Sequence, residues 1–173
     1  MCKIQIVAGI SDKEILQRVY HLRVQARNDL GIITFEKYPD GWFDHLDETA
    51  KHFIVLRDGI LIGSARLNLF DCIQHHPYYP AIEHLVFAIK DRIAYFSRAA
   101  VHPDFRSNGL WTDLINERLL YAKDKNVKHA FLDASPEKEN MLVLKGWKSL
   151  GRGKFEKISW ELEPEHYLFY NEL

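Results

Sequence analysis

The passage from residue 98 to residue 111 constrains the fold of this chain most strongly. It reads Arg-Ala-Ala-Val-His-Pro-Asp-Phe-Arg-Ser-Asn-Gly-Leu-Trp, which predicts the end of a strand, a short loop and the start of a helix. Such a loop directs several backbone N–H groups at one anion. The helix N-terminus adds partial positive charge, and glycine lets a phosphate approach closely. The passage therefore predicts an anion site, and the alternative is an ordinary strand–loop–helix joint with a solvent-facing arginine.

The rest of the chain predicts strands and helices in alternation. Asp58-Gly59 between two apolar runs is typical of a tight hairpin turn. Apolar residues at helical spacing predict a helix at roughly 12–27, entered through a capping box at Ser11–Glu14. We further expect strands at 3–8, 52–57, 60–68, 93–101, 128–134, about 154–161 and about 165–170, helices at 81–90 and 109–123, a short helix capped by Ser135 that ends before Gly146, and a loop-like segment at 28–50.

This order of elements favours an α/β (α+β) fold with one mixed central sheet flanked by helices. The chain has 173 residues, of which 47% are hydrophobic, so it can bury a substantial core. That length suits one domain over residues 1–173 better than two.

Composition narrows the classes of function. The 23 basic and 24 acidic residues give a formal net charge of -1, so no global field attracts nucleic acid or an anionic membrane. The start lacks a signal-like apolar stretch, no apolar run reaches membrane-spanning length, and the two cysteines form no framework. We therefore expect a cytoplasmic protein. His45 and His75-His76 lack a third ligand at a recognisable spacing, so no metal site is expected.

Residues 100–109 resemble the strand and pyrophosphate loop of GNAT acyltransferases, written R/Q-x-x-G-x-G/A. Arg106 and Gly109 match that pattern, and Trp111 stands where it has a small residue. The resemblance implies acetyl-CoA or acyl-CoA as cosubstrate. It also implies that the donor is bound by Val101, Arg106, Ser107, Asn108, Gly109, Leu110 and Trp111.

The later run Met141–Leu150 is similar to the family's helix-to-strand stretch Y-x-x-x-G-F. Gly146 and Trp147 match it, whereas Leu142 occupies the position of the tyrosine. Many GNAT enzymes use that tyrosine to reprotonate the leaving thiolate. The resemblance therefore leaves the general acid of this chain unassigned.

The N-terminal half resembles two relatives of that family, the acyl-homoserine-lactone synthases and the long-chain N-acyl amino acid synthases. Tyr95 replaces the glutamate of their pattern. We expect an ion-pair network that orders the 28–50 segment, and the alternative is that one carboxylate binds the substrate ammonium. The residues that match the pattern in order are Arg23, Asp44, Asp47, Arg66 and Ser97-Arg98.

Attack of an amine on a thioester requires a base and hydrogen-bond donors for the developing oxyanion. Glu83, Tyr95, Ser97 and Arg98 are the catalytic candidates. Strand alternation predicts that Ser97 and Arg98 lie on opposite faces. We expect transfer of an acyl group from acyl-CoA, or from an acyl carrier protein, to a small-molecule amine.

Two other classes of function stay open. One is a catalytically silent acyl-CoA binding or sensing module, which the missing tyrosine and the Tyr95 substitution favour. The other is an unrelated α/β binding domain. The sequence leaves the acceptor, the acyl length and the formation of a homodimer undetermined.

Overall fold

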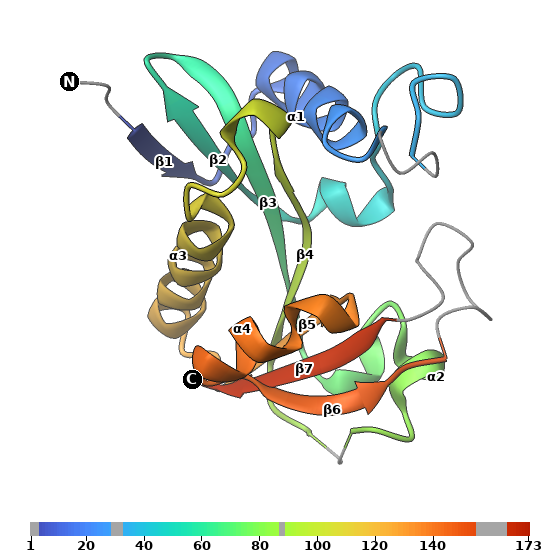
Figure 1. Ribbon diagram of the computed structural model, residues 1–173. Coiled ribbons are helices and arrows are strands. Elements are labelled where there is room, and N and C mark those ends of the chain that lie inside the picture. The colour runs from blue at the N-terminus through green and yellow to red at the C-terminus, as the bar shows by residue number, and fades with distance from the viewer. Residues whose placement is uncertain (1–3, 29–32, 87–88, 155–165) are drawn as a thin grey trace. The chain divides into compact units, whose positions relative to one another are not determined.

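The computed structural model describes residues 4–28, 33–86, 89–154 and 166–173 (Figure 1). Within these residues the strands form one seven-stranded sheet in the order β1-β2-β3-β4-β5-β7-β6. The sheet is mixed, as predicted, because β4 and β5 are parallel while β1 with β2, β2 with β3, β5 with β7 and β6 with β7 are antiparallel. The strands are β1 (Ile4–Ala8), β2 (Lys51–Arg57), β3 (Ile60–Phe70), β4 (Ile93–Val101), β5 (His129–Ala134), β6 (Lys148–Arg152) and β7 (Tyr167–Glu172).

Helices connect the strands, and the chain forms two compact units. The helices are α1 (Lys13–Gln25), α2 (Tyr79–Ile82), α3 (Leu110–Asp124) and α4 (Glu139–Leu144). The first unit comprises Met1–Asn68 and Ser97–Arg118, and the second comprises Leu69–Phe96 and Leu119–Leu173. The bounds of β3 and β4 show that both strands run through the two units.

In the first unit, local sequence accounts for α1 and the hairpin. Asp12 is the N-cap of α1, and its carboxylate accepts a hydrogen bond from the amide of Ile15 at 2.9 Å. The predicted capping box at Ser11 is therefore wrong by one residue, because Asp12 is the acceptor nearest to the unpaired amides. Asp58 and Gly59 have φ angles of 51° and 81°, which confirms the tight turn between β2 and β3.

The segment that follows α1 returns across that helix. The amide of Trp42 donates to the main-chain oxygen of Tyr20 at 3.0 Å. A Cβ on Gly41 would lie 2.5 Å from the Cβ of Tyr20, so only glycine permits this approach. Trp42 is buried with Val24 and Ile33. This packing fixes the position of the Trp42 side chain on the helix.

The second unit is built on β5. Residues Ile93–Phe96 of β4 pair in parallel with His129–Leu132, and β7 pairs with the other edge of β5 and with β6. In Figure 1, α4 lies along the strands β7 and β6. The core of this unit consists of Ile73, Ala81, Ile82, Ile89, Ile93, Phe131, Leu168 and Tyr170.

Two predicted elements differ from the structure. The helix expected at 81–90 is only Tyr79–Ile82, because the chain tightens at once into a turn in which the amide of Leu85 bonds to the oxygen of Ile82 at 2.8 Å. Residues 87 and 88 lie outside the described part. β6 was not among the strands expected from the residue pattern, although the resemblance of Met141–Leu150 to a helix-to-strand stretch implied a strand there; it contains Gly151 at a φ of 105°. Most of the strand expected at 154–161 falls on residues that are not described, whereas the last strand is confirmed as β7.

Candidate functional site

The predicted phosphate loop joins β4 to α3 in the first unit. A short 3₁₀ turn at Pro103–Phe105 precedes Arg106. Ser107 and Gly109 then have φ angles of 65° and 77°. Left-handed residues within a turn direct neighbouring N–H groups to one side, and such concavities bind anions. The backbone therefore has the form that the sequence predicted for an anion site.

The N-terminus of α3 adds further donors to this loop. The first intrahelical bond runs from the amide of Asp113 to the oxygen of Gly109 at 3.1 Å, so the amides of residues 110–112 precede the hydrogen-bond ladder of the helix. Leu110 is buried and anchors the first turn. A Cβ on Gly109 would meet no described atom within 4 Å. The space in front of this glycine is therefore open to a ligand.

The side chains of the loop mainly hold the loop itself. The side-chain nitrogen Nδ2 of Asn108 donates to the main-chain oxygens of Phe105 and Arg106, both at 3.2 Å. Arg106 is exposed overall, and its Nη2 donates to the oxygen of Ala26 at 2.7 Å. Ala26 is the C-cap of α1, where a cation is favourable. Backbone amides therefore supply much of the capacity of the loop to bind an anion.

The remaining predicted donor residues flank the loop. Val101 ends β4, and the amide of the next residue, His102, donates to the oxygen of Ile62 on β3 at 2.9 Å. Trp111 is half-buried in the first turn of α3. All of the residues predicted to bind the donor thus lie within one short segment of the first unit.

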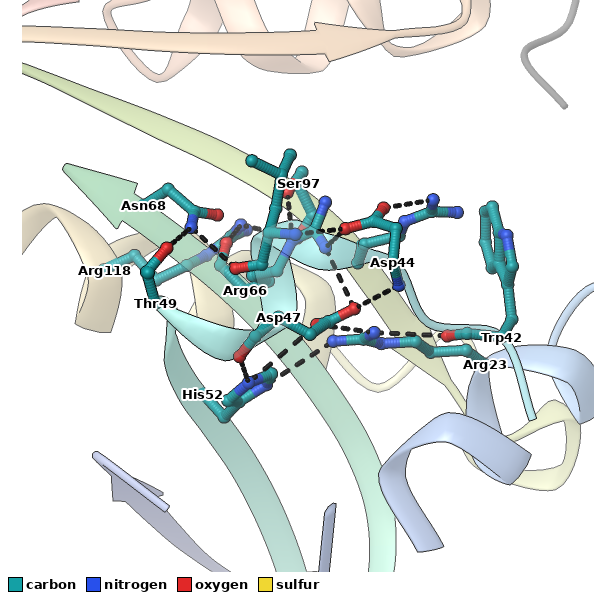
Figure 2. A network of polar contacts seen from close by, with 12 residues as sticks. Arg23, Trp42, Asp44, Asp47, Thr49, His52, Arg66, Asn68, Ser97 and Arg118 are labelled. Carbon is teal, nitrogen blue, oxygen red and sulfur yellow. Dashed lines mark hydrogen bonds and ion pairs between the residues drawn. The ribbon is translucent and has the colours of Figure 1, made fainter. Parts of the chain in front are cut away.

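A buried ion-pair network lies in the same unit, and Figure 2 shows its aspartates facing the guanidinium groups. Arg23 bonds to Asp47 at 2.9 Å, and Arg66 bonds to the other oxygen of Asp47 at 3.0 Å. Arg66 also contacts Asp44 at 2.5 Å. Arg98 contacts the second oxygen of Asp44 at 2.6 Å. The network predicted from these residues is therefore confirmed.

The spacing of the two aspartates has a local cause. Asp44 caps the 3₁₀ turn His45–Glu48, and its carboxylate accepts from the amide of Leu46 at 2.9 Å. Asp47 accepts from the amide of Asp44 at 2.9 Å. This reciprocal capping box positions both carboxylates through hydrogen bonds within the turn itself. The D-x-x-D pattern is thus the signature of a rigid turn that carries two acceptors.

Burial determines the protonation behaviour of the network. The side chains of Arg23 and Asp47 are 0% and 2% exposed, whereas that of Asp44 is 24% exposed. Burial lowers the pKa of Arg23 to about 10, although Asp47 opposes this change. Burial alone would raise the pKa of Asp44, but Arg66 and Arg98 hold it well below its usual range. Burial also lowers the pKa of His52, and the positive charge of Arg23 acts in the same direction.

Ser97 and Arg98 both reach this network, although alternation placed them on opposite faces. Arg98 has a φ of 51°, so its left-handed backbone interrupts the pleat of β4. Its guanidinium carbon lies 3.5 Å from the ring centroid of Trp42. Ser97 accepts a hydrogen bond from Nε of Arg66 at 2.9 Å. The prediction of opposite faces is therefore wrong, because of the backbone at Arg98.

Arg118 also belongs to this site, although it was not among the residues predicted from the sequence. It is fully buried on α3, and burial lowers its pKa to about 9. Its guanidinium donates to the main-chain oxygens of Leu114 at 2.9 Å and Arg66 at 3.2 Å, and to that of Ser97 at 3.5 Å. Its position four residues after Leu114, on the apolar face of the helix, was the signal available in the sequence.

A second polar cluster lies in the second unit. The hydroxyl of Tyr95 donates to Asp133, whose other oxygen lies 3.1 Å from Nδ1 of His166. Burial would raise the pKa of Asp133, but these partners keep it below its usual range. The ring of His76 lies 4.3 Å from that of Tyr95, and burial lowers the pKa of His76 to about 4. Asp133 and His166 were not predicted, because they meet only through strand pairing.

The structure thus places the catalytic candidates in three settings. Ser97 and Arg98 join the ion-pair network of the first unit, and Tyr95 joins Asp133 in the second. Glu83 is exposed at the C-cap of α2. Leu142, in the position of the family tyrosine, is fully buried and carries no transferable proton.

No three histidine, cysteine, aspartate or glutamate side chains among the described residues are grouped so that they could hold a metal ion. No helix in the described ranges is long and apolar enough to cross a membrane.

The strand–helix joint of this mixed sheet combines amides that precede the hydrogen-bond ladder of α3 with open space at Gly109, a geometry that suits an anion. The acetyltransferase (GNAT) family model matches residues 16–144, and the chain belongs to that family. It is therefore an acyltransferase. The family draws its acyl group from acetyl-CoA or acyl-CoA. A comparison with curated protein sequences gives no match.

Solved structures of low sequence identity share the fold. FeeM, an N-acyl amino acid synthase from uncultured soil microbes, superposes with a TM-score of 0.79 at 12% identity, over 99% of this chain and 92% of that one. The AHL synthase LasI gives 0.73 at 14% identity, over 99% and 91%. A GNAT family acetyltransferase from Elizabethkingia anophelis with acetyl-CoA bound gives 0.62 at 14%, over 98% of each chain. The predicted resemblance to these groups is confirmed.

Proposed function

We propose that this protein transfers an acyl group from a pantetheine thioester to the amine of a small molecule. The observation that carries this proposal is the loop from Arg106 to Gly109, where two left-handed residues and the N-terminus of α3 present amides beside open space. An anionic diphosphate or phosphate fits these donors. The pantetheine arm then follows β4 toward Arg98 and Ser97.

The donor is either acyl-coenzyme A or an acylated carrier protein, since both end in the same phosphopantetheine. The acetyl-CoA-bound relative supports the first donor. The likeness to FeeM and LasI, together with Trp111 at the end of the loop, supports a longer acyl group or a carrier-protein donor. Only coenzyme A carries an adenosine diphosphate group. The loop would therefore bind a diphosphate in coenzyme A but a single phosphate in the carrier protein.

The acceptor is a primary amine that reaches the thioester in its neutral form. FeeM is an N-acyl amino acid synthase, so amino acids are the first acceptors to test. Glu83 and Tyr95 remain candidates for proton transfer. The hydroxyl of Tyr95 donates a hydrogen bond to Asp133. Any role of Tyr95 in proton transfer therefore involves the Asp133 carboxylate as well.

Release of free thiol tests this function. The intact protein is incubated with coenzyme A thioesters of increasing acyl length, and separately with an acylated carrier protein, each with a panel of amines. Turnover with a coenzyme A thioester supports the coenzyme version. Turnover with the carrier protein alone, together with no calorimetric binding of any coenzyme A thioester, would overturn that version.

A catalytically silent module that binds acyl-CoA is the rival, because Leu142 is buried where the family has its tyrosine. This rival predicts calorimetric binding of acyl-CoA without thiol release for any donor or amine. Turnover with one amine decides against it. Light scattering of the eluted protein tests whether the chain forms a homodimer, which is a separate prediction.

A further inference from the structure

Ser97 is held by an arginine that is itself fixed on both sides. Nε of Arg66 donates to the Ser97 hydroxyl oxygen at 2.9 Å, while Nη1 of Arg66 bonds to Asp44 at 2.5 Å and to Asp47 at 3.0 Å. Arg66 is 1% exposed. The main-chain oxygen of Ser97 also accepts from Arg118 at 3.5 Å. The network therefore positions the hydroxyl group of this one serine.

The hydroxyl of Ser97 retains a proton to donate. Serine offers one donor and two acceptor positions, and Arg66 uses an acceptor position. Among the described residues, no protein acceptor receives the Ser97 proton. A bond from a guanidinium polarises the hydroxyl and strengthens it as a donor. Ser97 is half-buried, so part of this residue is exposed.

The position of Ser97 on β4 suits the reacting end of the donor. Ser97 lies four residues before Val101, where the strand enters the phosphate loop, and this separation is about 13 Å along a strand. An extended pantetheine arm anchored at the loop spans such a distance. Ser97, the loop and the network all belong to the first unit.

We propose that the Ser97 hydroxyl donates a hydrogen bond to the carbonyl oxygen of the thioester and stabilises the oxyanion, with Arg66 as a positioning residue. This inference rests on the proposed function. The neutral amine nitrogen forms a bond to the carbonyl carbon, and the carbonyl π electrons move to the oxygen that faces Ser97. The oxyanion then collapses, the carbon–sulfur bond breaks, and the thiolate departs with the electron pair. The nitrogen loses its proton to a base or to water, and Ser97 keeps its own.

The aspartates of the network do not suit this role, because carboxylates that pair with arginines accept hydrogen bonds and donate none. Their part is to hold Arg66. A role of Ser97 in the transition state also predicts an effect on kcat rather than on binding. This prediction separates Ser97 from Arg106, whose proposed contact is with the donor phosphate.

Steady-state kinetics of Ser97→Ala, Ser97→Thr and Ser64→Ala provide the first test. Loss of one oxyanion donor lowers kcat by roughly 100-fold, so we expect a fall of that order in Ser97→Ala with the donor KM nearly unchanged. Ser97→Thr keeps the hydroxyl and should recover most of kcat. Ser64 on β3 is fully buried, so Ser64→Ala removes a serine hydroxyl elsewhere and should leave kcat near the wild-type value. A wild-type kcat in folded Ser97→Ala overturns the inference.

An infrared measurement tests the same contact without turnover. The probe is the ketone analogue of acetyl-CoA, in which CH₂ replaces sulfur, labelled with ¹³C at the carbonyl. Its carbonyl stretch should move to lower frequency on binding to wild-type protein and less far on binding to Ser97→Ala. If Ser97→Ala does not fold, Ser97→Cys replaces it in this comparison, because the thiol is similar in size to the hydroxyl and is a weaker hydrogen-bond donor. An equal shift in wild type and variant overturns the inference. Absence of wild-type turnover with every donor would instead overturn the proposed function.

Discussion

Nη2 of Arg106 donates a hydrogen bond to the main-chain oxygen of Ala26 at 2.7 Å. The arginine of the phosphate loop therefore also supports the C-terminal end of α1. Its loss should have two consequences, one for the donor and one for the fold.

Arg106→Ala should raise the KM of the donor by roughly ten- to a hundredfold, since a charged hydrogen bond contributes about 1.5–3 kcal/mol. It should also lower the free energy of unfolding, because the oxygen of Ala26 loses its partner. Steady-state kinetics and urea unfolding measure the two effects. Arg18→Ala removes an exposed arginine of α1 and should change neither value appreciably. An unchanged donor KM in Arg106→Ala would count against the placement of the phosphate at this loop.

Gly109→Ala and Gly59→Ala form a matched pair. Their φ angles are 77° and 81°, and a Cβ at either position meets no described atom within 4 Å. Each alanine should therefore cost about 1–2 kcal/mol of stability through the left-handed backbone. Only Gly109→Ala should also raise the donor KM, because its methyl group occupies the space proposed for the phosphate. Equal KM values in the two variants would contradict this assignment.

Asp47→Asn should destabilise the protein by about 3–5 kcal/mol, because it leaves the buried charges of Arg23 and Arg66 without their shared carboxylate. Urea unfolding followed by circular dichroism measures the loss. Asp124→Asn is the control, since the pair of Asp124 with Lys125 is exposed and exposed pairs contribute little to stability. A loss no larger than that of the control would show that the network is not a major source of stability.

His76 should make unfolding dependent on pH. Its pKa falls from 6.5 to about 4 in the folded protein because it is buried. Below pH 6.5 the unfolded chain binds a proton that the folded chain excludes, so the stabilisation present above pH 6.5 is lost as the pH falls toward 4. A depression of this size corresponds to roughly 3 kcal/mol.

His76→Phe provides the comparison, because phenylalanine keeps a ring of similar size and does not titrate. The free energy of unfolding of wild type, measured between pH 7 and pH 4, should fall more steeply than that of His76→Phe. Parallel pH profiles would show that His76 does not contribute to the slope.

Elements whose signals are local could be predicted from the sequence. The strand predicted at 93–101 agrees with the bounds of β4, the Asp58-Gly59 pair predicted the hairpin, and helical spacing predicted α1 and α3. The helix expected at 81–90 was wrong because its apolar residues pack as a turn in the second unit's core. β6 had no alternation to reveal it, since its pairing with β7 is what makes it a strand.

Residues of the site, too, could be predicted only where their signal was local. The loop and the D-x-x-D turn are short local patterns, so their residues were found in order. Asp133 and His166 are 33 residues apart, and only the pairing of β5 with β7 brings them together. The sequence likewise predicted a regular pleat through Ser97 and Arg98. The φ of Arg98 depends on tertiary contacts with Trp42 and Asp44, which no propensity records.

The backbone at Arg98 limits which residues position 98 can accept. Glycine or asparagine would suit a φ of 51° but would leave Asp44 without its second cation. Lysine would keep the charge but not the flat group that lies over Trp42. β-branched residues, which strands usually favour, would be the least tolerated. Among homologues that keep this loop and turn, position 98 should vary less than its neighbours on β4.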